Sequence, residues 1–132
     1  MKLLVISVLA WLAGLAAYIA ALWLLWGQTI HDLTAVVVWS GLAAAVAVAV
    51  GFAPVMFVLR NRLAGRRAGA WAFPLVGCLL GVVPVVLITA VWSSDLWRAL
   101  FSPEAGLFSC MFSIFGATFG EGFFLAYGRR SA

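Results

Sequence analysis

Few side chains in this sequence are of a type that does chemistry, and one of them lies inside an apolar stretch. Apart from Glu104 at the start of the fourth stretch, Glu121 is the only acidic or basic residue in such a stretch, and it stands between Gly120 and Gly122. A carboxylate is costly to place in a membrane, which favours a functional role such as a proton- or cation-sensitive site. The alternative is structural. A position about 9 Å along the helix from Tyr127 lets the carboxylate reach an arginine or the lipid headgroups.

A second candidate polar site lies on the first apolar stretch. Ser7, Trp11 and Tyr18 share one face of a helix through this stretch. Their hydroxyl and indole groups need hydrogen-bond partners when buried. These residues either line a slot for a lipid or another ligand, or bond to neighbouring helices. His31 and Asp32 resemble a catalytic pair only in sequence, and we interpret Asp32 as a helix cap.

Other chemistry is not indicated. Cys78 and Cys110 lie on different apolar stretches and form no metal or redox motif, so we interpret them as packing residues. The sequence contains no nucleophile elbow, phosphate-binding glycine loop or metal-binding helix motif. We therefore expect no enzymatic activity, no cofactor and no metal site.

The elements that must position these residues are membrane spans. The chain has 132 residues, of which 67% are hydrophobic and 9% are charged, whereas a soluble domain has about a quarter charged. About 20 apolar residues cross a bilayer as a helix. Four stretches qualify: Leu3–Trp26, Thr34–Leu59, Trp71–Trp92 and Pro103–Tyr127. The first is longer than the apolar region of a signal peptide. The short connections predict an all-α membrane protein with four helices in an up-down antiparallel bundle, as a single integral membrane domain over residues 1–132.

Small residues predict how these helices pack, because close backbone approach drives association in lipid. The predicted packing positions are Gly41, Ala45 and Ala49 in the second span, Gly77 and Gly81 in the third, and Gly116 and Gly120 in the fourth. The run in the second span indicates that it is the central helix. A stripe of phenylalanines on the fourth span is expected to face lipid, which would turn Glu121 toward protein: Phe108, Phe112, Phe115, Phe119 and Phe123.

The charges predict orientation. Lysine and arginine in short loops mark the cytoplasmic side. Apart from Arg98, every basic residue lies before the first span, between the second and third, or after the fourth: Lys2, Arg60, Arg62, Arg66, Arg67, Arg129 and Arg130. Both termini are therefore expected in the cytoplasm. The arginines are expected to contact anionic lipid headgroups rather than nucleic acid, and the excess of arginine over lysine favours a bacterial cytoplasmic (inner) membrane.

The many helix-contact positions and the absence of catalytic motifs favour one function. We expect a non-catalytic accessory or stabilising subunit that packs against a larger integral membrane protein, or forms a homo-oligomer, among membrane lipids. The alternative is a small transporter or lipid-handling membrane protein that uses Glu121 near the cytoplasmic side.

Overall fold

The computed structural model describes residues 1–27, 32–63 and 66–128, and this part of the chain is all-helical. Its elements are α1 (Lys2–Trp26), α2 (Leu33–Ala47), η1 (Val48–Phe52), α3 (Ala53–Leu63), α4 (Gly69–Trp92), α5 (Leu96–Leu100), α6 (Pro103–Phe123) and η2 (Phe124–Gly128). Together they give four helical spans long and apolar enough to cross a membrane: Lys2–Trp26, Leu33–Leu63, Gly69–Trp92 and Pro103–Gly128. The protein is a multi-pass membrane protein.

The helix ends follow from local chemistry. The Asp32 carboxylate accepts a hydrogen bond from the amide of Ala35 at 3.1 Å and caps α2. The Ser102 hydroxyl accepts from the amide of Ala105 at 3.3 Å and caps α6. Such caps satisfy amides that have no partner within the helix. The second span runs on to Leu63 instead of ending at residue 59, and places arginines in its last turn, where the helix dipole favours positive charge.

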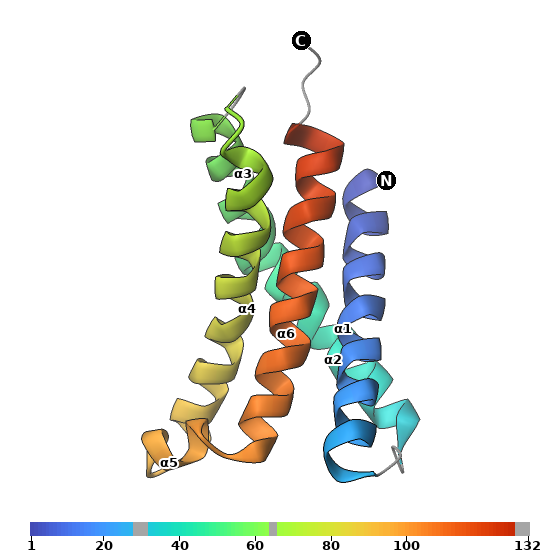
Figure 1. Cartoon of the computed structure of the whole chain (residues 1–132), viewed down its shortest axis with the longest axis vertical. Coiled ribbons are helices and arrows are strands. Elements are labelled where there is room, and N and C mark those ends of the chain that lie inside the picture. The colour runs from blue at the N-terminus through green and yellow to red at the C-terminus, as the bar shows by residue number, and fades with distance from the viewer. Residues whose placement is uncertain (28–31, 64–65, 129–132) are drawn as a thin grey trace.

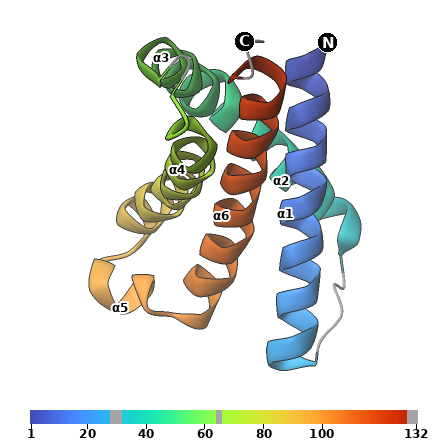
Figure 2. The same cartoon turned by 45° about the horizontal axis from the view of Figure 1, so that its top comes forward.

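Helix α6 is the central helix. Figure 1 shows it between α4 and α1, with α2 crossing behind at an angle, and Figure 2 confirms this order from a second direction. Along its length α6 contacts both α4 and α1, whereas α2 contacts chiefly α1 among the long helices. The prediction that the second span is central is therefore wrong. Its small residues Ala45 and Ala49 are exposed.

The tightest packing in the molecule is the contact between α4 and α6, which we call the glycine seam (Gly77, Gly81, Gly116 and Gly120). A Cβ atom at Gly77 would overlap the carbonyl of Gly116, and one at Gly81 would overlap the carbonyl of Phe112. A Cβ at Gly120 would overlap the carbonyl of Phe73. The contacting residue numbers rise along α4 as they fall along α6. Backbones approach this closely only where side chains are absent.

The core is aromatic, and the expectation that the phenylalanine stripe faces lipid is wrong. Phe115, Phe119 and Phe123 are at most 2% exposed, Phe112 is buried, and only Phe108 is exposed. Phe52 meets Phe115 edge to face, with ring centroids 5.3 Å apart. Lipid chains are as apolar as these rings, so hydrophobicity alone does not determine which side of the helix is buried. Shape complementarity and dispersion determine it, and they favour the rings inside. Large rings fill the space beside the seam.

The second span changes its winding halfway along. Residues 48–52 form the wide turn η1, and Pro54 follows it in α3. Proline has no amide to donate and its ring crowds the preceding turn, which is a common cause of such a local bulge. Phe52 in this turn and Met56 after it are buried in the core, whereas much of α2 before the turn is exposed.

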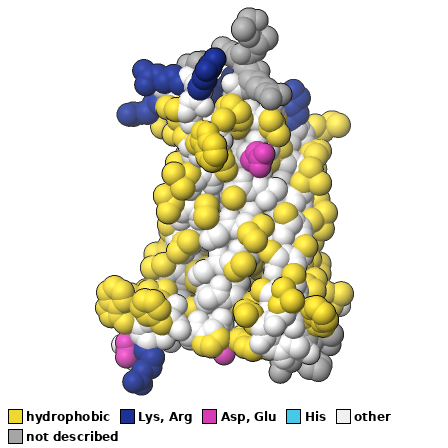
Figure 3. Space-filling view, in the orientation of Figure 1, with side chains coloured by type: hydrophobic (Ala, Val, Ile, Leu, Met, Phe, Trp, Pro, Cys, Tyr) yellow, Lys and Arg dark blue, Asp and Glu magenta, His cyan; other side chains and the backbone are white. Residues whose placement is uncertain are grey.

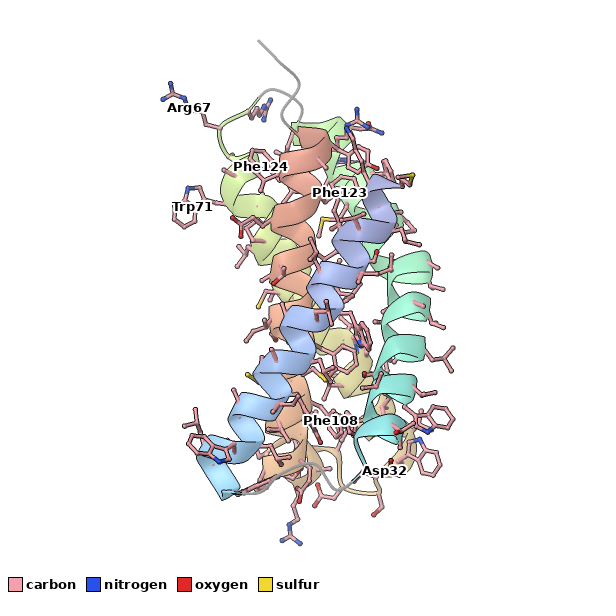
Figure 4. All side chains as sticks on the ribbon, turned by 90° about the vertical axis from the view of Figure 1, so that its right-hand side faces the viewer. Asp32, Arg67, Trp71, Phe108, Phe123 and Phe124 are labelled. Atoms are coloured by element: carbon pink, nitrogen blue, oxygen red, sulfur yellow. The ribbon has the colours of Figure 1, made fainter. Side chains whose placement is uncertain are left out.

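Charged side chains gather at the two ends of the bundle. Figure 3 shows lysine and arginine crowded at one end, and acidic groups with further basic atoms at the other. Arg67 lies at the first end and Asp32 at the second (Figure 4). Between them the visible face is largely apolar. The predicted headgroup-binding residues Arg62, Arg66 and Arg67 are exposed and Arg60 is half-buried. Arg129 and Arg130, like His31, lie outside the described residues.

Candidate functional site: an apolar cleft beside α2

A cleft of about 660 Å³ lies between α2 on one side and α4 and α6 on the other, near the Asp32 end. Figure 4 shows this end with Phe108 and Asp32 labelled. Most of the lining is apolar. The lining residues are Tyr18 from α1; Ala35, Val36, Trp39, Ser40 and Ala43 from α2; Val85, Ile88, Thr89 and Trp92 from α4, followed by Ser93; Ala99 and Ser102; and Glu104, Ala105, Phe108, Met111 and Phe112 from α6.

Helical periodicity explains why these residues share the cleft. The α2 residues recur at intervals of one and three, from Ala35 to Ala43, which is one face of a helix. The α4 residues recur at three, one and three, from Val85 to Trp92. Exposed residues such as Ala45 lie on other faces of α2. The cleft is thus the space between helix faces that meet without interlocking.

Helix α2 is held to the bundle from the side by Trp11. The indole Nε1–H donates to the Ser40 hydroxyl oxygen at 3.0 Å. Gly41 lies beneath the same indole, since a Cβ there would be 3.6 Å from its ring. The Ser40 hydroxyl in turn donates to the carbonyl of Val37 at 3.3 Å. Trp11 therefore ties α2 to α1 and leaves the α4 and α6 side of α2 open.

Two hydroxyl groups in the cleft have their protons committed. The Thr89 hydroxyl donates to the carbonyl of Val85 at 2.7 Å, and the Ser102 hydroxyl donates to that of Ala99 at 2.6 Å. The Thr89 oxygen keeps acceptor capacity, and the Ser102 oxygen, which already accepts from the amide of Ala105, keeps one lone pair. Among the described residues that line it, Glu104 is the only one with a charged side chain. The cleft therefore offers one negative charge and hydroxyl acceptors on an apolar surface, together with the hydroxyl of Tyr18 and the indole N–H groups of Trp39 and Trp92, which are neutral donors.

The structure separates the polar residues that the sequence grouped on α1. Tyr18 lines the cleft and stacks on Phe108, with ring centroids 5.7 Å apart. Trp11 serves the cleft indirectly through Ser40. Ser7 is half-buried and donates to the carbonyl of Leu3 at 2.8 Å within its own helix. These residues do not form one slot.

Glu121 lies outside the cleft lining and its side chain is exposed. The expectation that it turns toward protein is wrong, and the reason is the phenylalanine stripe. Because Phe119 and Phe123 are buried, the opposite side of α6 faces outward. Glu121 lies on that side, about 160° from the stripe.

Sequence reasoning missed the cleft, because its walls are ordinary apolar residues. Glu104 gave the one local signal, but an acid in the first turn of a helix is also explained by the helix dipole. Cys110 is exposed and Cys78 is half-buried. The described residues contain no group of three or more histidine, cysteine, aspartate or glutamate side chains able to hold a metal ion.

No protein-family model, curated protein or solved structure matches this chain.

Proposed function

We propose that the protein is a non-catalytic membrane protein that binds an apolar or amphipathic molecule in the cleft beside α2. The observation that carries this proposal is the cleft itself. Its volume of about 660 Å³ falls in the range of small-molecule sites, roughly 300–1,000 Å³, and such sites are mostly apolar with a few polar groups. The sequence analysis gave a lipid-handling protein as the alternative function, with Glu121 as its site. The proposal keeps that function and places the site in the cleft, at the opposite end of the bundle.

The proposal is tested by filling the cleft. Ala43 lines it, whereas Ala45 lies exposed on the same helix. In mild non-ionic detergent, a brominated C16 alcohol should quench tryptophan fluorescence, because Trp39 and Trp92 line the cleft. We expect Ala43→Phe to weaken this binding about tenfold, since the ring takes the volume of the ligand. Ala45→Phe is the matched control. Equal binding by both variants and the native protein would contradict the proposal.

We further propose that the bundle is up-down and antiparallel in a bacterial cytoplasmic membrane, with both termini in the cytoplasm. Exposed Arg62, Arg66 and Arg67 at one end support this orientation, because Arg98 is the single arginine or lysine among the described residues at the other end. The cleft then opens near the outer leaflet. In a protein without native cysteines, an impermeant thiol reagent on intact cells should label Ser94→Cys and not Arg67→Cys. The reverse labelling would contradict the orientation.

An accessory-subunit role is a second candidate, and the exposed face of α2 favours it. Ala45 and Ala49 are small and exposed, so another transmembrane helix can approach the α2 backbone there. We expect Ala49→Ile to reduce copurification of a stoichiometric membrane partner, or of a second copy, without lowering thermal stability. Retention of the same partner by Ala49→Ile at native levels would remove this candidate.

A further inference from the structure

The lining of the cleft combines aromatic rings with a single acid. Glu104 lines the cleft together with Trp39, Trp92, Tyr18 and Phe108. We propose that the cleft selects a single-chain amphiphile with a cationic ammonium head. The inference rests on the proposed function and names the ligand class of that same site.

The head must decide selectivity, because the tail cannot. A tail that leaves the bilayer for the cleft exchanges one apolar environment for another, since lipid chains are as apolar as leucine. Apolar lining residues such as Val85 and Ile88 therefore accept a chain without ranking one amphiphile above another. Discrimination falls to the polar groups that line the same cleft.

Those groups favour positive charge in three ways. Glu104 supplies a negative charge. The hydroxyl oxygens of Thr89 and Ser102 act as acceptors, because their protons are used inside the protein. Exposed Trp39 and Trp92 offer ring faces, which attract ammonium groups.

An anionic head would find no basic partner among the described lining residues. Arg98 lies next to the lining residue Ala99 on α5, but its side chain is exposed and does not line the cleft. An anionic head would also meet the charge of Glu104. The charge on the described lining residues is therefore negative only.

The dimensions favour one chain. Along α6 the lining extends from Glu104 to Phe112, which is roughly 12 Å at 1.5 Å per residue. A volume of about 660 Å³ suits one chain or a molecule of drug size. A phospholipid would bring a second chain and a phosphate, which the negative charge of Glu104 opposes and no basic lining residue neutralises. We therefore commit to a single-chain cationic amphiphile.

The test compares three probes that share one brominated C16 tail and differ in the head: trimethylammonium, sulfate and hydroxyl. Quenching of the tryptophan fluorescence of the full-length protein in non-ionic detergent reports binding. We expect the trimethylammonium probe to bind about five- to tenfold more tightly than the hydroxyl probe, and the sulfate probe most weakly. The preference should fall with added salt, because Glu104 is exposed.

Variants locate the effect. Glu104→Gln should reduce the ammonium preference, measured as the ratio of trimethylammonium-probe to hydroxyl-probe affinity, to about twofold or less, and Glu104→Asp should largely retain it. Asp32→Asn is the matched control, because Asp32 is an acid at the same end outside the lining and asparagine caps a helix equally well. Its preference should equal that of the native protein.

Each contrary outcome has a separate meaning. Equal binding of all three heads, weakened by Ala43→Phe, would overturn the cationic selectivity and leave the cleft function standing. Tighter binding of a brominated phosphatidylethanolamine than of the ammonium probe would overturn the single-chain assignment. Absence of quenching by every probe would overturn the proposed function itself.

Discussion

The two sides of α6 solve the same packing problem in opposite ways. Toward α4, the backbones meet at the glycine seam, where Gly77 and Gly116 leave no room for a Cβ atom. Toward α2, the helices stand apart around a cleft of about 660 Å³. The difference shows what holds helices together in lipid. Close approach requires a missing side chain on at least one of the two facing positions, and apolar surface alone does not close a gap.

The contrast is sharpest for small residues that look equivalent in sequence. Gly81 lies buried in the seam, whereas Ala49 lies exposed on α2. Each belongs to a four-residue spacing of small residues. The partner decides the outcome, because Gly81 meets the backbone of Phe112 on α6, whereas Ala49 is exposed and packs against no such surface.

The largest effect is expected from one methyl group in the seam. Gly81→Ala places a Cβ against the carbonyl of Phe112, so the helices must separate. We expect a loss of about 2–3 kcal/mol in the free energy of unfolding, and a greater loss for Gly81→Ile. Gly106→Ala is the control, because a Cβ there meets nothing within 4 Å. Thermal and denaturant unfolding in detergent measure the stability of both alanine variants. Equal stability of the two alanine variants would remove the seam as the basis of packing.

The buried rings should give the next effect. Phe119 is fully buried, whereas Phe108 is 45% exposed. We expect Phe119→Ala to cost about 2 kcal/mol, less than the roughly 3–5 kcal/mol of a phenylalanine buried in a water-soluble core, because in a membrane the cavity term remains and much of the water-transfer term does not. Phe108→Ala should cost about 0.5 kcal/mol or less. The same unfolding assay measures both variants, and a loss from Phe119→Ala as small as that from Phe108→Ala would indicate that the stripe faces lipid, as the sequence predicted.

The spans and their helix caps could be predicted from the sequence, but which helix faces pack against one another could not. Apolar length placed four spans, and Asp32 and Ser102 cap helices as their positions indicate. Hydropathy could not place Phe119 or Glu121, because a helix apolar all round has no solvent-facing side to identify. The cleft was also invisible, since it arises from how α2 meets the bundle. Of the predicted polar residues, only Tyr18 lines it.

A smaller effect should come from the bond that ties α2 to α1. Trp11→Phe keeps a ring above Gly41 and removes the indole donor to Ser40. Hydrogen bonds between membrane helices contribute about 0.6 kcal/mol on average, so the stability loss should be of that order. The cleft should respond more clearly, with altered affinity for the brominated C16 alcohol. Trp26→Phe, at an exposed ring, is the control. Unchanged cleft affinity in Trp11→Phe would show that Trp11 does not set the position of α2.

The smallest effect is expected at Glu121, the acid inside the fourth span. Glu121 is exposed and lies outside the cleft lining, so Glu121→Gln removes a charge without emptying a packed site. We expect its stability to stay within about 0.5 kcal/mol of the native protein, and its affinity for the ammonium probe to stay unchanged. Glu104→Gln should instead weaken binding of the ammonium probe, because Glu104 lines the cleft.

Reconstituted vesicles provide the decisive measurement of proton coupling, through collapse of a proton gradient in the presence of the same probe. A probe-dependent flux in the native protein that disappears in Glu121→Gln would make the exposed acid a coupling site and the protein a transporter. Absence of such a flux in both proteins, with binding retained, would mean that the cleft binds its ligand without proton coupling at Glu121.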